Sequence, residues 1–329
     1  MQERLLGACA LGGLMAASSA IAADKVAYQL DWLPGGDKAP IYVCIEKGFC
    51  EAEGLDVTIV PGRGSTDAIS RLAAGSSDIG MADIGALMAA KAQEGVGVTA
   101  VMSVFNTGPH AFYTLAGSGF GSVADVKGRT IATSPFTSSN VYLPLVLEEV
   151  GATEDDLTLI KADPGALGPM LMTGQADGII AWMTDLTRYG NQAAEAGKEI
   201  VALPWSEAGL ELYSAALIAS DGFLAERPDV AARFVRAFRA SVEFCREHPE
   251  DAAASVAAIV PELGAEDVTG SLKDALPLIF NEVTGTHGLG TFDADRLAAT
   301  WARVAEAQGL DAAGFDPETA VARSYLPES

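Results

Sequence analysis

The chain has 329 residues, of which 49% are hydrophobic and 20% are charged, and its formal net charge at pH 7 is -23. This composition is typical of a globular protein rather than a disordered one, and the length is sufficient for two ordinary domains. The acidic balance disfavours nucleic acid and anionic membrane surfaces as partners, because both bind through Lys and Arg.

The first 22 residues have the pattern of a secretory signal peptide. Arg4 lies in a short charged start, an apolar stretch follows, and the segment ends in the small-x-small sequence Ala20-Ile21-Ala22. The alternative, a retained membrane anchor, fits less well with the many small residues. We therefore predict that residues 1–22 are a cleaved signal peptide and that the mature protein is in the periplasm.

Three cysteines follow this segment. Cys44 and Cys50 lie on either side of a predicted helix end at Gly48, so in an oxidising compartment they can form a local disulfide; two small buried thiols are the alternative. Cys245 is predicted to be a thiol in the core. The histidines are far apart in the sequence and no C-x-x-C motif occurs, so we predict no metal site and no cofactor.

A repeated unit is the most informative feature of the chain. Each copy reads as a strand, a turn, a helix and a second strand, the minimal unit of a parallel sheet. The helix ends at Gly75 or Gly174, which suits a left-handed helix cap, and Asp78 or Asp177 follows three residues later. Chance similarity of two α/β segments is the alternative. The copies are residues 57–83 and 157–182.

The two copies predict two α/β lobes. Strands are expected at residues 25–32 and 98–105 in the first lobe and at residues 128–134 in the second. Passages near residues 105–112 and 213–220 would join the lobes as a hinge. The C-terminal part shows helical spacing of apolar residues. We predict lobe one to comprise residues 23–108 and 219–329, and lobe two residues 109–218.

No motif of a common catalytic site occurs. The sequence lacks a G-x-S-x-G elbow, an H-E-x-x-H motif and a Walker loop. Gly62-Arg63-Gly64 follows a strand as in a dinucleotide fingerprint, but Asp67 stands where the third glycine belongs, which favours a simple turn. We therefore predict no catalytic residue and no enzymatic activity.

Small polar residues occur at two predicted helix starts, one in each lobe. Free backbone N–H groups and hydroxyls at such places can bind a polar ligand, although ordinary helix capping is the alternative. Ligands of open α/β sheets bind at the carboxyl ends of strands, so we expect one shared cleft. The candidate ligand-binding residues are Gly64, Ser65, Thr66, Ser134, Thr137, Ser138, Ser139 and Asn140 at helix starts, and Asp31, Trp32, Asp83, Trp182 and Asp185 at strand ends.

The chain resembles the ABC-transporter solute-binding proteins of the SsuA/ThiY-like group, which also includes the thiamine-pyrimidine synthase fold. The strings "LDW…IYV…KG…EGLDV", "SVADVKGRTIATS" and "GQADG" carry the likeness, which runs through most of residues 25–250. The resemblance implies a two-lobed periplasmic-binding-protein fold of type II. Its parallel-sheet lobes would be joined by a two-strand hinge and would close on one small molecule.

The resemblance also implies roles for four residues. Asp31 and Trp32 match positions that contact a pyrimidine in the thiamine-precursor branch, and Trp182 and Asp185 resemble an aromatic and acidic pair of the second lobe. Tryptophan rings can stack on a planar ligand, and carboxylates can accept hydrogen bonds from ring amino groups. Strand-end packing is the alternative for each residue. The cysteine-rich iron motif of the synthases has no counterpart here, which argues against the enzyme.

These features predict a periplasmic solute-binding protein that works with the permease and ATPase subunits of an ABC importer. Since Arg63 and Arg188 are the only candidate cations near the predicted cleft, we favour a neutral or amino-bearing heteroaromatic solute, such as a thiamine pyrimidine precursor. The alternatives are an alkylsulfonate, an aromatic carboxylate or another small organic anion, a synthase-like enzyme, and a sensor subunit. We expect a monomer that binds no nucleic acid.

Overall fold

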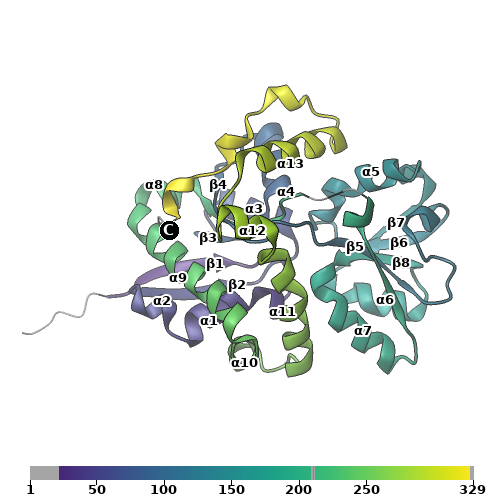
Figure 1. Ribbon diagram of the computed structural model, residues 1–329, viewed down its shortest axis with the longest axis horizontal. Coiled ribbons are helices and arrows are strands. Elements are labelled where there is room, and N and C mark those ends of the chain that lie inside the picture. Colours follow the sequence, from purple (N-terminus) through teal and green to yellow (C-terminus); the bar gives the residue numbers. More distant parts are fainter. Residues whose placement is uncertain (1–21, 209, 211, 327–329) are drawn as a thin grey trace, which may run out of the picture.

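Two α/β lobes lie side by side in the computed structural model, which describes residues 22–208, 210 and 212–326 (Figure 1). The predicted signal peptide lies outside the described residues, except for residue 22. Within the described ranges, no helix is both long and apolar enough to cross a membrane.

The first lobe is built on a five-stranded sheet in the order β2-β1-β3-β10-β4. The first three strands of the chain run parallel to one another, while β10 runs antiparallel to both of its neighbours. β3 and β10 are buried along their whole length, so they form the centre of this lobe. The strands are β1 (Asp24–Gln29), β2 (Leu55–Val60), β3 (Ile79–Asp83), β4 (Val98–Ser103) and β10 (Ala215–Ser220).

The second lobe has a sheet with the same plan, in the order β7-β6-β8-β5-β9. Here β5, the strand that arrives from the first lobe, runs antiparallel to β8 and β9. Both sheets are therefore mixed rather than wholly parallel as predicted, because each contains one strand that enters from the other lobe. The strands are β5 (His110–Leu115), β6 (Thr130–Thr133), β7 (Thr158–Lys161), β8 (Gly178–Trp182) and β9 (Ile200–Pro204).

The predicted repeat is present in both sheets. Gly75 and Gly174 follow the equivalent helices with φ of 68° and 73°, the left-handed region that glycine adopts without strain. Asp78 and Asp177 each accept a hydrogen bond of 2.8 Å from a backbone N–H of the neighbouring strand. Each aspartate therefore fixes the start of an inner strand in the same way. The helices are α3 (Ser65–Ala73) and α6 (Leu167–Thr173).

Two passages join the lobes and run against each other. The Phe105 N–H donates to the Ala215 carbonyl (2.8 Å), and the Ser214 N–H donates to the Phe105 carbonyl (2.9 Å). The chain is therefore back in the first lobe from Ala215 onward. The boundary predicted between residues 218 and 219 lies inside β10, because residues 215–218 pair with β3 and β4 rather than with a strand of lobe two.

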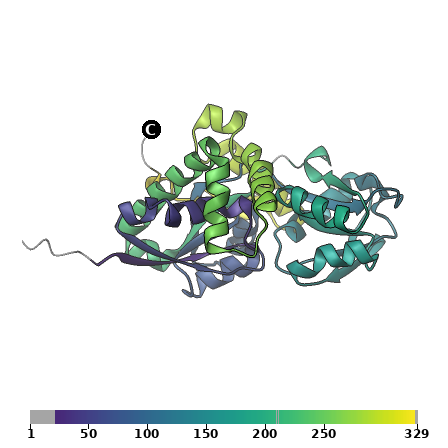
Figure 2. The same cartoon turned by 90° about the horizontal axis from the view of Figure 1, so that it is seen from below.

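Helices cover both lobes, and one of them reaches across the boundary. Figures 1 and 2 show α11 between the lobes, where it packs against the 3₁₀ turn η1 (Gly36–Lys38) of lobe one and α7 of lobe two. Thr187 of α7 donates to Asp274 of α11 through its N–H (3.1 Å) and its hydroxyl (2.9 Å). The remaining helices are α1 (Ala39–Glu46), α2 (Phe49–Ala52), α4 (Ile84–Glu94), α5 (Ser139–Glu149), α7 (Leu186–Glu195), α8 (Asp221–Glu226), α9 (Pro228–Glu247), α10 (Pro249–Ile259), α11 (Ala265–Ile279), α12 (Glu282–His287) and α13 (Ala294–Ala307).

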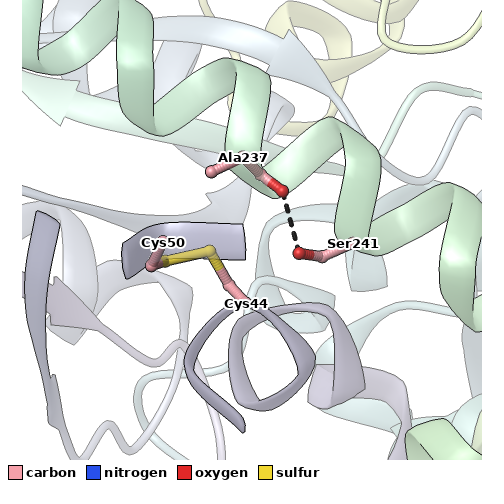
Figure 3. Close-up of a disulfide and its surroundings, with 4 residues drawn as sticks. All are labelled: Cys44, Cys50, Ala237 and Ser241. Carbon is pink, nitrogen blue, oxygen red and sulfur yellow. Dashed lines mark hydrogen bonds between the residues drawn. A yellow bond between two sulfur atoms is a disulfide. The ribbon is translucent and has the colours of Figure 1, made fainter. Parts of the chain in front are cut away.

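A disulfide joins α1 to α2. The Sγ atoms of Cys44 and Cys50 are 1.99 Å apart, and Gly48 between them has a φ of 77°. Figure 3 shows the bond beside α9, where the Ser241 hydroxyl donates to the Ala237 carbonyl (2.8 Å). Both cysteines are buried, so the disulfide fixes a tight turn within the core of the first lobe.

Removing this disulfide should lower the free energy of unfolding by about 2 kcal/mol, because it closes a short loop in the unfolded chain. The C44A/C50A variant and the reduced wild type should show the same loss in urea unfolding. Cys245→Ala removes the buried free thiol of α9 and is the matched control, which should stay sensitive to reductant. A wild-type unfolding curve that does not respond to reductant would contradict the prediction.

Candidate ligand-binding site

A small cavity lies between the lobes, where residues after β1, β2 and β6 meet the end of β8. Its volume is about 10 Å³, enough for about one water molecule. The structure thus shows the lobes closed together around this point. The cavity is lined by Asp31, Trp32, Gly64, Ser65, Thr137, Ala181 and Trp182. All of these except Ala181 are candidate residues from the sequence.

A buried cation fills the space beside this cavity. The Lys38 Nζ lies 2.8 Å from Asp31 Oδ1, 2.8 Å from Asp37 Oδ2 and 5.0 Å from the centre of the Trp182 ring. Lys38 and Asp31 are each only 1% exposed. Burial disfavours the charged ammonium, but the attraction of Asp31 and Asp37 outweighs it and raises the pKa of Lys38 above its usual value. The lysine is therefore charged at neutral pH.

Lys38 was not among the residues predicted from the sequence. In "GGDKAP" it reads as an ordinary charged residue of a helix start, and its burial depends on carboxylates that only the fold brings near. Burial also raises the pKa of Asp37, against the opposing effect of Lys38. One feature of the sequence could have indicated its role. Asp31 and Asp37 both precede Lys38 by a few residues, and two buried carboxylates need a cation nearby.

Several buried polar atoms at this place lack a hydrogen bond within the described structure. They include both indole Nε1 atoms, of Trp32 and Trp182, and the carboxylate oxygens of Asp31, although Asp31 Oδ1 makes the ion pair. Buried polar groups in proteins are nearly always hydrogen-bonded, and each exception needs an explanation. The cleft thus offers two N–H donors and a carboxylate acceptor to a bound molecule.

The helix start of lobe one holds the lobes together at the rim of the cavity. Thr66 donates to the Phe136 carbonyl through its N–H (3.2 Å) and its hydroxyl (3.0 Å), and the Ser134 hydroxyl donates to the Arg63 carbonyl (3.1 Å). Gly64 has a φ of 155°, and a Cβ there would lie 2.1 Å from the Phe136 carbonyl oxygen. Gly64 is therefore required for closure, and Thr66 and Ser134 contact the opposite lobe rather than the cavity.

Two of the other helix-start residues of lobe two, Ser139 and Asn140, form hydrogen bonds within the protein. Asn140 makes hydrogen bonds with residues 133–134, and the Ser139 Oγ lies 2.9 Å from His110 Nδ1. Ser138 is buried, and its hydroxyl has no hydrogen-bond partner among the described residues. None of these three side chains lines the cavity, although Thr137, which directly precedes Ser138 in the sequence, does.

Asp83 caps α4 instead of lining the cavity. Its carboxylate accepts hydrogen bonds from the Ala86 N–H (3.0 Å), the Tyr142 hydroxyl (2.9 Å) and the Ser214 hydroxyl (2.7 Å), and His110 Nε2 lies 3.7 Å away. Burial opposes ionisation, but the nearby His110 and the hydrogen bonds together hold the pKa of Asp83 below its usual value. Asp83 therefore anchors Tyr142 of lobe two and Ser214 of the hinge to lobe one.

Asp185 lies in an adjoining cavity on the other side of Trp32. Its Oδ1 is 3.0 Å from an Arg188 Nη atom, and burial raises the pKa of Asp185 against the opposing effects of Arg188 and Lys38. This cavity measures about 40 Å³ and is also lined by α11, a contribution that the sequence did not indicate. A larger cavity of about 650 Å³, between β4 and the C-terminal segment, contains none of the candidate residues.

The Asp83 network predicts a defined pH dependence. Because its pKa is lowered in the folded protein, ionised Asp83 adds stability above the unfolded value of about 3.9, and this is lost as the pH falls through the folded value. Asp83→Asn should therefore lower the melting temperature at neutral pH, by a loss of about 1–3 kcal/mol in unfolding free energy, and the difference from wild type should shrink in acid.

The difference in stability between wild type and Asp83→Asn is measured by thermal unfolding, followed by circular dichroism, between about pH 3 and pH 7. This range covers the pH values at which carboxylates change their charge. Tyr142→Phe is the control, because it removes one hydrogen bond to Asp83 but keeps the carboxylate. It should be destabilised and still lose stability in acid. A difference between wild type and Asp83→Asn that stays constant with pH would count against the role of the Asp83 charge.

Comparisons with known proteins agree with this architecture. The structure matches the alkanesulfonate-binding protein SsuA of Xanthomonas axonopodis pv. citri with a TM-score of 0.71 at 18% identity, covering 92% of this chain and 99% of that one. This likeness confirms the expected two-lobed fold of periplasmic binding proteins. Among relatives in sequence, the riboflavin-binding protein RibY of Chloroflexus aurantiacus is 25% identical over 92% of this chain and 86% of its own length.

A second relative is the formylaminopyrimidine-binding protein of Halalkalibacterium halodurans, which is 28% identical over 72% of this chain and 71% of its own. The model of the NMT1/THI5-like family matches residues 36–252, well over half of the chain. The family resemblance noted in the sequence is thereby confirmed, and the chain belongs to the NMT1/THI5-like family.

Proposed function

We propose that this chain is the solute-binding protein of an ABC importer and that its lobes close on a small heteroaromatic solute. The observation that carries the proposal is the group of buried polar atoms between the lobes that make no hydrogen bond among the described residues, namely the indole N–H groups of Trp32 and Trp182 and the carboxylate of Asp31, whose Oδ2 also has no ion-pair partner in the structure. A flat ring with a donor for Asp31 and acceptors for the indoles would complete their hydrogen bonds.

The charges around the cleft support a neutral or amino-bearing solute rather than an anion. Three carboxylates, Asp31, Asp37 and Asp185, stand against two cations, Lys38 and Arg188, which leaves one negative charge when all are ionised. A sulfonate or carboxylate would have to displace Lys38 from its partners or lie beside uncompensated carboxylates, and both are costly in a buried site. The names of the two relatives, which bind riboflavin and a formylaminopyrimidine, support the same class of ring.

Closure would couple binding to transport. Since residues of both lobes line the cavity, a solute that contacts both stabilises the closed form over the open one. The closed form would then dock on the permease, which works with an ATPase subunit, in the periplasm. A sensor role, in which a membrane kinase reads the closed form, and a pyrimidine-synthesis enzyme are the alternatives to transport.

A thermal-shift panel tests the solute class. The panel contains 4-amino-5-hydroxymethyl-2-methylpyrimidine, riboflavin, benzoate and propanesulfonate. A solute at 100 times its dissociation constant should stabilise the protein by about 2.7 kcal/mol. We expect a shift with an amino-bearing heteroaromatic. A shift with propanesulfonate alone would overturn the solute class but keep the binding function, and formation of a new pyrimidine product on incubation would favour an enzyme.

Asp31→Ala tests the carboxylate. Loss of one charged hydrogen bond to the solute should weaken binding at least about tenfold, measured by isothermal titration calorimetry. Asp78→Ala is the matched control, because this carboxylate also accepts a hydrogen bond near β1 but belongs to the start of β3, away from the cavity. It should lower stability and leave the affinity unchanged. If Asp31→Ala binds the solute with unchanged affinity, Asp31 has a structural role and does not contact the solute.

A further inference from the structure

The surroundings of the Lys38 ammonium resemble those of a bound organic cation. Its ammonium lies between two carboxylates, 2.8 Å from each, and faces the Trp182 ring at 5.0 Å. Carboxylates together with an aromatic face form the usual environment for recognition of an organic ammonium or a protonated amine. The cavity beside it has room for about one water molecule, so no organic solute fits while Lys38 and the lobes hold these positions.

We propose that Lys38 is an internal ligand, whose ammonium occupies the subsite that receives an amino or cationic nitrogen of the solute. The inference rests on the proposed function and narrows it to solutes that carry such a nitrogen, for example an aminopyrimidine. The solute would displace Lys38 from Asp31 and take its place over Trp182. Asp37 remains available to Lys38 after displacement, since it lines the adjoining cavity with Asp185.

The surroundings of Lys38 differ from those of a purely structural lysine. Lys91 shows the structural case, because its Nζ donates to the carbonyls of Val96 (3.3 Å) and Val98 (2.8 Å). Lys38 Nζ lies 2.8 Å from Asp31 Oδ1, but neither Nζ nor either Asp31 oxygen makes a well-aligned hydrogen bond among the described residues. A buried polar group without an aligned hydrogen bond destabilises the folded protein, and a ligand that forms this hydrogen bond would recover the lost free energy.

The displacement has a consequence for selectivity. A tethered ammonium competes with every ligand, so a solute without a group that replaces it would leave Asp31 buried and unpaired, which is strongly unfavourable. An amino-bearing solute replaces the lost partner and does not meet this cost. Lys38 would therefore exclude neutral rings without an amino group while it weakens the affinity for the solute that is selected.

Two truncations of Lys38 leave spaces of different length. Lys38→Ala removes three methylenes and the ammonium, which matches n-propylammonium, whereas Lys38→Met removes little more than the ammonium, which matches the ammonium ion. We expect n-propylammonium to raise the melting temperature of Lys38→Ala, and ammonium that of Lys38→Met. Neither n-propanol nor sodium should do so, and wild type should not respond.

Lys273→Ala is the matched control, because Lys273 also pairs with a carboxylate, Glu250 (3.1 Å), but both side chains are exposed. It should show no selective response to either cation. If a truncated variant does not fold alone, the yield of folded protein is measured after refolding with each additive. Only the matching cation should raise this yield. Absence of a matched response in both truncated variants, by stability and by refolding, would overturn the proposal.

A second arm tests whether the solute uses the same subsite. Lys38→Ala should bind 4-amino-5-hydroxymethyl-2-methylpyrimidine at least tenfold more tightly than wild type, and n-propylammonium should compete with it. Weaker binding to Lys38→Ala would make Lys38 a direct solute contact and overturn the proposal. A matched response to the cations, with no solute of the panel bound by wild type, would instead support the cation subsite and count against the proposed transport function.

Discussion

The burial of the Lys38–Asp31 ion pair beneath a side chain of the other lobe is the constraint around which the cleft of this structure is built. A buried charge loses its hydration, and only paired charges with good geometry recover that loss. Here the cation belongs to the first turn before α1, one carboxylate follows β1, and the ring that faces the cation comes from β8 of the other lobe. The charges of lobe one are thus sheltered from water by a side chain of lobe two, and opening of the lobes would expose them again.

The boundary between the lobes combines an apolar cluster, in which α4 and α13 meet α5, with several polar contacts that water can replace. Thr66 with Phe136, Ser134 with Arg63, and Thr187 with Asp274 are hydrogen bonds that solvent can supply in an open form. These polar contacts define the geometry of closure and add little to its free energy, since closure exchanges hydrogen bonds to water for hydrogen bonds within the protein. A solute that contacts both lobes can then shift the balance between the two forms.

The sequence allowed the architecture to be predicted because its signals are local. Gly75 and Gly174 mark the ends of two helices, because both adopt the left-handed conformation. The strand that follows each of them is a short apolar run. The site was predicted less completely. Asp31 and Asp83 look alike in the sequence, since each stands at the end of an apolar strand-like run. In the structure Asp83 caps the first turn of α4, whereas Asp31 faces Lys38.

The part of the site that escaped prediction depends on contacts far apart in the chain. Lys38 is buried by Trp182, and the adjoining cavity is closed by α11, which follows both lobes in the sequence. No local pattern reports such contacts. The position of β10 also depends on contacts far apart in the chain. A single apolar strand can extend either sheet, and the pairing of β10 with β3 and β4 assigns it to the first.

In two-lobed α/β proteins the fold places the ligand between the lobes, and the side chains that line the cleft determine which ligand binds. At the helix starts that would suit an anion, two hydroxyls are engaged by the protein itself, since the Ser65 hydroxyl accepts the Asp83 N–H (3.1 Å) and the Ser139 hydroxyl pairs with His110. Among the described residues near the cavity, the polar groups without a hydrogen bond include the Asp31 carboxylate, which is ion-paired with Lys38, and the indole N–H groups of Trp32 and Trp182. The structural likeness to a sulfonate-binding protein thus shows the fold, and the proposed preference for a ring with a positive or hydrogen-donating nitrogen rests on these side chains.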